Sequence, residues 1–240
     1  MKTGIIGDIH SNLQALETVL AALDEERVDE VVCVGDVVGY GADPGACIER
    51  VRQRCRAVVV GNHDQAAVKK IPPDYFNAEA RSAIAWTTER LTDDERWWLS
   101  NLPLVHLEDA FSLVHGSFER PEEFRYIFDP EDAGPSFEKQ PAQVAFFGHT
   151  HWPVTFIDEN PVSLSLQSEV PVVLPAKMLV NVGSVGQPRD SNPAASYAVF
   201  DQDLRRVRLL RASYDVETAA ARIREAGLPP SLADRLSNGH

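Results

Sequence analysis

The chain contains little cysteine and no long hydrophobic run. Its three cysteines, Cys33, Cys47 and Cys55, are an odd number and show no C-x-x-C spacing, so they give no sign of a disulfide framework. We expect buried, reduced thiols, which suit a reducing cytoplasm. Asp8 interrupts the first apolar stretch too early for a signal peptide, and no segment approaches the ~18 apolar residues of a membrane span. These absences predict a soluble, cytoplasmic protein.

Basic runs are also missing. The 240 residues include 23 Lys and Arg against 36 Asp and Glu, which gives a formal net charge of −13. Such a charge repels duplex nucleic acid and anionic membranes unless a local basic patch compensates, and no run is long enough to form one. We therefore expect neither duplex DNA nor a membrane as a partner. An anionic substrate would need a local positive site, such as bound divalent cations.

The apolar content is sufficient for one domain over residues 1–240, because 44% of the residues are apolar. The first sixty residues alternate between predicted strands and helices, as in βαβ units. A capping-box spacing that starts at Ser11 predicts the first helix, and Asp43 with Pro44 predicts the start of the second. The strands are predicted at residues 3–7, 31–34 and 57–60.

The remainder of the chain departs from this alternation. Residues from about 65 to 102 predict a helical insertion, with one helix over 77–91 and a second that Thr92 caps. A last helix is predicted over 216–226, and the tail after about Gly227 is expected to fray. The region between them is rich in predicted strands, at residues 104–107, 111–115, 143–147, 154–157, 178–182, 197–201 and 204–210.

Acids, amides and imidazoles follow the predicted strands. Asp8, Asp36 and Asn62 are separated by 28 and 26 residues, so they are expected at the carboxyl ends of neighbouring parallel strands. A single histidine is more often a satisfied core residue, as expected for His106 and His240. Five of the seven histidines, however, occur in matching contexts, which favours a role as metal ligands for these five. The set comprises Asp8, His10, Asp36, Asn62, His63, His115, His149 and His151.

Two details indicate how this set would hold metal. Residues two apart in an extended segment point to the same side, so Asp8 and His10 are expected to bind one cation together. The two carboxylate oxygens of Asp36 allow it to bridge two metals, and Gly35 leaves room for close backbone approach beside it. The pattern predicts a hydrolase with two metal ions.

The ordered motifs D-x-H, G-D, G-N-H-D, H-G and G-H-T-H resemble those of the calcineurin-like metallophosphoesterase superfamily, specifically its small bacterial and archaeal phosphodiesterase-like branch. The resemblance covers about residues 3–200. It implies an α/β fold, a four-layer α/β/β/α sandwich of two mixed sheets flanked by helices. It also implies one metal on Asp8, His10, Asp36 and His151, a second on Asp36, Asn62, His115 and His149, and a catalytic, non-ligating His63 that contacts the phosphoryl group.

The activity implied by this resemblance is hydrolysis of a phosphoester by a water or hydroxide that bridges two divalent cations about 3.5–4 Å apart. We expect a phosphodiesterase acting on a small, nucleotide-like substrate. A phosphomonoesterase and a dinucleoside polyphosphate hydrolase are alternatives of the same class. A non-catalytic protein-binding scaffold would show eroded ligands and no central histidine, and here all of these residues are present.

The metals and partners follow from the residue types. Nitrogen and oxygen ligands without thiolate favour manganese or iron, with zinc, cobalt and nickel as alternatives, and the number of imidazoles disfavours magnesium. The expected partner is a small phosphoester, and the sequence indicates no oligomeric state.

The second motif differs from that of the eukaryotic-type serine/threonine phosphatases in the superfamily. Those enzymes carry G-D-x-V-D-R-G, whereas this chain has Gly39 and Tyr40 in place of the second aspartate and the arginine. The partner that would orient the catalytic histidine is missing at that place, which argues against a phosphoprotein phosphatase. Asp64 is open to two interpretations, because it would either orient His63 or cap the following segment.

A later segment, residues 181–189, resembles the N-x-G-S-x-G-x-P-R sequence of the same branch. Arg189 is a candidate for binding a second phosphate or a substrate carboxylate. Alternatively, Arg189 pairs with Asp190 or another acid and fixes the loop. Tyr40 and the insertion at 65–102 are candidates for a wall of the substrate site.

Overall fold

The computed structural model describes all 240 residues and contains two six-stranded mixed sheets. In the first sheet, three neighbouring strands from the start of the chain run parallel, and antiparallel strands from the second half extend it. Its order is β3 (Cys55–Val58), β2 (Glu30–Cys33), β1 (Lys2–Ile6), β11 (Ala195–Asp201), β12 (Arg206–Ala212) and β9 (Glu169–Pro171).

The second sheet is built entirely from the middle of the chain. Its three central strands run parallel, and antiparallel strands flank them on both sides. Its order is β4 (Val105–Leu107), β5 (Phe111–Val114), β6 (Val144–Phe147), β10 (Met178–Asn181), β7 (Val154–Ile157) and β8 (Ser163–Ser165). The predicted strands are all present with ends within two residues, whereas the short β8 and β9 were not predicted.

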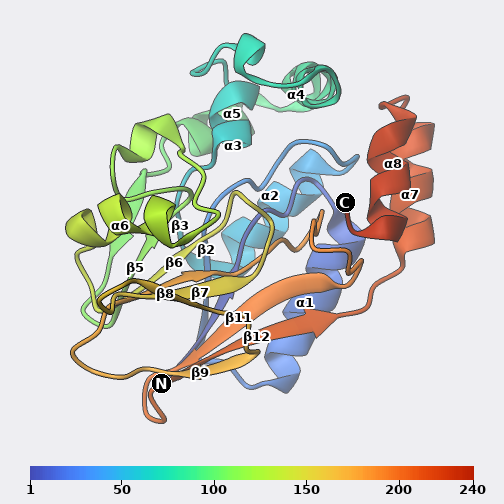
Figure 1. Ribbon diagram of the computed structural model, residues 1–240. Helices are drawn as coiled ribbons and strands as arrows, with labels where there is room; N and C mark the ends of the chain where they lie inside the picture. The colour runs from blue at the N-terminus through green and yellow to red at the C-terminus, as the bar shows by residue number, and fades with distance from the viewer.

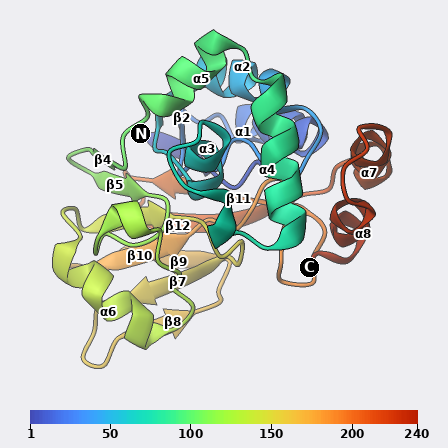
Figure 2. The same cartoon turned by 90° about the horizontal axis from the view of Figure 1, so that it is seen from above.

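The two sheets share one apolar core. Ile5 and Val32 of the first sheet belong to the same buried cluster as Phe111 and Phe146 of the second. Helices α1 (Leu13–Glu25) and α2 (Pro44–Arg54) cover the other side of the first sheet, and α6 (Pro130–Lys139) covers that of the second. Figures 1 and 2 show these helices outside the stacked sheets. The predicted four-layer α/β/β/α sandwich is confirmed.

Helix α1 begins one residue later than the capping-box spacing predicts. The side chain of Asn12, not that of Ser11, accepts the N–H of Ala15 and is the N-cap. A Ser11 cap is excluded because the Ser11 hydroxyl is buried without a hydrogen-bond partner. The shift leaves Leu16, Leu20 and Leu23 on the buried face, as expected for an amphipathic helix.

The helical insertion lies beside the carboxyl ends of the parallel strands of the first sheet (Figure 2). The predicted helices are present as α4 (Ala78–Arg90) and α5 (Asp93–Ser100), and Thr92 forms the predicted capping box with Glu95. They are preceded by α3 (Asn62–Ala67) and the 3-10 turn η1 (Pro73–Tyr75). A second 3-10 turn, η2 (Pro121–Glu123), follows β5 on the other side of the strand ends.

The C-terminal tail is ordered, which corrects the expectation of fraying after Gly227. Helix α7 (Val216–Glu225) is followed by α8 (Pro230–Asn238), and the two pack against each other. Leu232 and Leu236 of α8 are buried in a cluster that also contains Tyr40. The burial of this apolar face offsets the entropy of ordering the tail. No helix of the fold combines the length and the apolar character needed to cross a membrane.

Candidate metal centre

The predicted residues come together where the carboxyl ends of strands from both sheets meet. Asp8 follows β1, Asp36 follows β2, and Asn62 opens α3 after β3. His115 follows β5, and His149 and His151 follow β6 in the second sheet. Asp8, His10, Asp36, His63, His115, His149 and His151 are all buried, and Asn62 is half-buried.

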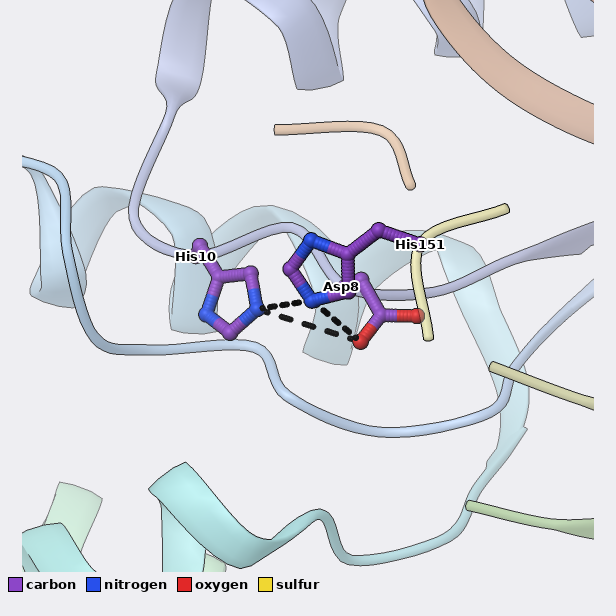
Figure 3. Close-up of side chains that lie close together, drawn as sticks. All are labelled: Asp8, His10 and His151. Carbon is purple, nitrogen blue, oxygen red and sulfur yellow. Dashed lines mark hydrogen bonds and ion pairs between the residues drawn. The ribbon is translucent and has the colours of Figure 1, made fainter. Parts of the chain in front are cut away.

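One cluster consists of Asp8, His10 and His151, whose donor atoms lie within 4.8 Å of one another (Figure 3). The two imidazole Nε2 atoms are 3.0 Å apart. Nε2 of His151 is 3.2 Å from Oδ1 of Asp8, and Nε2 of His10 is 3.8 Å from the same oxygen. Three potential ligand atoms therefore converge on one point.

A second cluster consists of Asp36, His115 and His149. Nε2 of His115 lies 3.3 Å from Oδ2 of Asp36 and 3.2 Å from the amide oxygen of Asn62. The same Asp36 oxygen is 3.6 Å from Nε2 of His10 in the first cluster. Asp36 therefore lies between the clusters, at the place where a bridging ligand is needed.

Backbone carbonyls fix the orientation of three imidazoles. In each ring Nδ1 donates its hydrogen to a carbonyl oxygen, which leaves Nε2 facing the site. The carbonyls also come from the loops that carry other site residues, so ring orientation depends on the packing of these loops. The pairs are His10 with Val38 at 3.2 Å, His115 with Val34 at 2.8 Å and His151 with Gln187 at 2.6 Å.

These donors fit bound cations. With both Nδ1 atoms donating, the lone pairs of His10 and His151 face each other across 3.0 Å, an arrangement that repels unless a positive centre lies between them. Nε2 of His149 is buried without any hydrogen-bond partner, which is costly unless a ligand satisfies it. Imidazole, carboxylate and amide donors of this kind suit first-row divalent metals.

The backbone at the site is left-handed rather than extended. Asp8 and His10 have φ of 49°, so the expectation of an extended D-x-H segment is wrong. The donor atoms of the two side chains nevertheless lie close together, in the same cluster. Such conformations are strained for residues other than glycine and persist only where the surroundings enforce them. The same feature recurs at Asp36, Tyr40, His149 and His151, with φ between 52° and 69°.

The loop after β10 holds the first cluster in place. The hydroxyl of Ser184 donates to the carbonyl oxygen of Asp8 at 2.8 Å, and the Gly186 N–H donates to the same oxygen at 2.9 Å. The carboxylate of Asp8 accepts the N–H of His149 at 3.0 Å, which joins loops of the two sheets. Sequence reasoning assigned no role to Ser184, although the N-x-G-S-x-G spacing marked the loop.

Burial and neighbouring charges set the protonation of the site. Burial lowers the pKa of His10 and His149 well below the usual histidine range, so both rings are neutral at pH 7. Burial alone would also lower the pKa of His115, but the Asp36 carboxylate outweighs it and raises the pKa to about 9. The metal-free site therefore contains a buried ion pair between His115 and Asp36.

His63 lies beside both clusters and also lines the pocket described below. Its ring centroid is 4.5 Å from that of Tyr40 and 5.0 Å from that of Phe76. One of its nitrogens lies within 4.8 Å of donor atoms of His10 and Asp36, so distance alone does not separate it from the candidate ligands. Nδ1 of His63 is buried and has no hydrogen-bond partner.

Asp64 caps α3 and does not orient His63. Its two carboxylate oxygens accept the N–H of Gly61 at 3.0 Å and the N–H of Val38 at 3.1 Å. Burial, followed by the nearby Asp36 carboxylate, raises the pKa of Asp64 to about 7. Of the two interpretations of Asp64, the hydrogen bonds support capping. The bond from the Val38 N–H also links Asp64 to the loop after β2.

A pocket of about 610 Å³ reaches the second cluster at His149. Asn62, His63 and His149 line it, and so do both predicted substrate contacts, Tyr40 and Arg189. Arg189 does not pair with Asp190, because Asp190 forms a salt bridge with Arg211 instead.

Sequence reasoning missed further residues of the pocket, among them Tyr126 and Arg235. The ring of Tyr126 stacks on His149 with centroids 3.9 Å apart, and Arg235 reaches the pocket from α8. The alternating aromatics at positions 124, 126 and 128 were a readable signal for Tyr126. Arg235 had no such signal, because its segment was expected to fray.

Several known proteins are similar to this chain in sequence or in fold. The uncharacterized protein MJ0912 of Methanocaldococcus jannaschii is 36% identical over 239 residues, which cover 98% of this chain and 97% of that protein. The crystal structure of a metallophosphoesterase from Sphaerobacter thermophilus matches with a TM-score of 0.90 and 36% identity, covering 100% of this chain and 99% of that one. A symmetrical bis(5'-nucleosyl)-tetraphosphatase from Methylobacillus flagellatus is 30% identical over 122 residues, which cover 48% of this chain and 43% of that protein.

The family comparison covers the whole candidate centre. The family model of the calcineurin-like phosphoesterase superfamily domain matches residues 1–204, a range that includes the second sheet, every strand of the first sheet except β12, and all eight residues of the predicted set. The match confirms the resemblance that the motifs indicated. The chain belongs to the calcineurin-like phosphoesterase superfamily.

Proposed function

We propose that the protein is a dinuclear-metal phosphodiesterase that acts on a small, nucleotide-like substrate. The observation that carries this proposal is the arrangement of two donor clusters around a shared Asp36, beside a pocket of about 610 Å³ that Asn62, His63 and His149 line. Pockets of this size accommodate small molecules, not duplex nucleic acid. Two cations would also provide the local positive charge that a chain with a net charge of −13 lacks.

The proposed ligands follow from the two clusters. Asp8, His10, Asp36 and His151 would hold one cation, and Asp36, Asn62, His115 and His149 would hold the other. Bound there, the cations would act as Lewis acids on the phosphoryl oxygens and lower the pKa of water. Manganese and iron are the proposed metals because the donors are nitrogen and oxygen without thiolate.

His63 is proposed to contact the substrate as a neutral hydrogen-bond donor. Burial lowers the pKa of His63 to about 4, so the ring is uncharged at pH 7. Because Nδ1 has no partner, we assign the single ring proton to Nε2. From the pocket wall, this N–H would stabilise charge that develops on a phosphoryl or leaving oxygen, an effect typically worth ~10²–10⁴ in rate.

A dinucleoside polyphosphate hydrolase is the second candidate. The similarity to the symmetrical bis(5'-nucleosyl)-tetraphosphatase favours it, although that similarity covers 48% of this chain. The aromatic side chains of Tyr126 and Phe124 in the pocket are compatible with a nucleobase in either case. A non-catalytic scaffold is disfavoured because every candidate ligand and His63 is present in the site.

The test is hydrolysis by the full chain after reconstitution with manganese or iron. An aryl phosphodiester should be cleaved faster than the aryl phosphomonoester, and His63→Ala and Asp36→Asn should each reduce the rate at least about 10²-fold. Absence of activity in a folded, metal-loaded protein on all three substrates, the third being a dinucleoside tetraphosphate, would refute the proposal. A preference for the monoester would overturn only the substrate class.

A further inference from the structure

Two arginines on the pocket wall have no acidic partner. Most arginines of this acidic chain pair with carboxylates, as Arg208 does with Glu26 and Arg222 with Asp43. Arg189 and Arg235 line the pocket and form no salt bridge. An uncompensated guanidinium in a half-buried position is a feature that an anionic ligand would satisfy.

Neutral groups hold Arg189 in place. Its Nη2 donates to the side-chain oxygen of Gln187 at 3.0 Å and to the hydroxyl of Tyr40 at 3.3 Å. Its Nε is buried and has no hydrogen-bond partner. The backbone carbonyl of Gln187 accepts the Nδ1 hydrogen of His151, a candidate metal ligand. Arg189 therefore follows, two positions later in the chain, a residue that orients a candidate ligand. The guanidinium is positioned and keeps a free donor.

Arg235 reaches the same region from α8, outside the residues that the family model matches. Leu232 and Leu236, on either side of it in the helix, pack in the apolar cluster that contains Tyr40. Arg235 and Tyr40 both line the pocket, and the Tyr40 hydroxyl accepts a hydrogen bond from Arg189. The two arginines and Tyr40 therefore border the same cavity.

We propose that Arg189 and Arg235 form an anion subsite next to the metal centre, which binds a second, non-reacting phosphate of the substrate. The substrate class is then a nucleoside polyphosphate in which the reacting phosphate and its neighbour are linked. The subsite narrows the substrate class of the proposed function. It rests on that function, because the metal centre defines which phosphate reacts. Guanidinium pairs match phosphate oxygens in geometry and charge, and the aromatic rings of Tyr126 and Phe124 line the same pocket.

Binding to the metal-free chain tests the subsite without any activity. Inorganic tripolyphosphate is titrated into the full chain in excess chelator, with Arg189→Gln, Arg235→Gln and Arg224→Gln as variants. Arg224 is the control, because it lies in the same helical hairpin but is exposed and pairs with Asp234. Each pocket variant should weaken binding at least about tenfold, and the control should bind as the wild type does. Equal binding by all four proteins would exclude the subsite.

Kinetics of the metal-loaded chain then test the substrate class. For Arg235→Gln, the ratio of kcat/KM for a dinucleoside tetraphosphate to kcat/KM for an aryl phosphodiester should fall at least about tenfold. An equal loss on both substrates, or no loss on either, would overturn the assignment. If the wild type cleaves neither substrate, the proposed function fails, while the tripolyphosphate titration still decides whether the arginines bind phosphate.

Discussion

The imidazole of His63 packs against the backbone of Gly39. A Cβ atom at position 39 would lie 2.6 Å from Nδ1 of His63, closer than any real contact of this type. Gly39 also has φ of 101°, a conformation that side chains rarely adopt. Position 39 is the place where the chain departs from G-D-x-V-D-R-G, so the aspartate of that motif does not fit beside His63 as it lies here. Packing against Tyr40 and Phe76 positions the ring instead.

Gly39→Ala should therefore impair catalysis while leaving metal binding intact. The added methyl group displaces the His63 ring, and a misplacement of about 1 Å costs on the order of 10²-fold in kcat. Gly227→Ala is the matched control, because Gly227 has φ of 71° but has nothing near its Cβ position. Steady-state kinetics and metal analysis on both variants provide the measurement. Full activity in Gly39→Ala would show that His63 does not need its present position.

Asp36→Asn should reduce bound metal from two ions to one or none. Oδ2 of Asp36 lies within reach of both His10 and His115, and the amide would present a weaker, uncharged donor at the shared position. The exposed Asp74, changed to Asn, serves as the control. Elemental analysis of the dialysed proteins gives the stoichiometry, and two ions retained by Asp36→Asn would rule out its bridging role.

Metal binding at pH 7 should release about one proton per chain. The pKa of His115 is raised to about 9, so the ring is protonated at pH 7 and must lose its proton to become a ligand. His10 and His149, with lowered pKa, contribute none. The contribution of His115 should fall to near zero as pH rises above 9, because the ring is then already neutral, and any remaining release comes from water on the metals. Titration calorimetry in two buffers of different ionisation enthalpy measures the release, and an unchanged apparent enthalpy between buffers would contradict the assignment.

Ser184→Ala should weaken metal binding about 10- to 100-fold, which is typical for groups that orient ligands. The variant loses the hydrogen bond that holds the Asp8 carbonyl and the one that the Ser184 hydroxyl accepts from the N–H of Gln187. Ser196→Ala removes an equally buried bond, from the Ser196 hydroxyl to the Val182 carbonyl at 2.8 Å, and is the control. Both variants should lose about 1 kcal/mol of folding stability, but only Ser184→Ala should change the metal Kd. Equal metal affinities would assign Ser184 a purely structural role.

The sequence predicted the strands and the clustering of the candidate residues, because both depend on local patterns. Apolar runs marked the strands, and polar motifs directly after them marked the carboxyl ends at which side chains such as Asp8 and Asp36 meet. Helix α6 was missed because Gly134 and Pro135 lie inside it, although Asp129 and Pro130 formed a proper start signal. The left-handed backbone at Asp8 and His10 has no local signal, since tertiary contacts impose it.

Helix α8 has a practical consequence for work with this protein. The family match ends at residue 204, so a shortened form cut to that boundary would lose strand β12, both C-terminal helices, Arg235 and the packing behind Tyr40. Because β12 pairs with β11 along its whole length, such a form would lack part of the first sheet, and its behaviour would not represent that of the full chain. A purification tag attached after His240 would sit next to the same helix, whereas Met1 lies beside Asp203 at the hairpin between β11 and β12. The amino terminus is the safer end for modification.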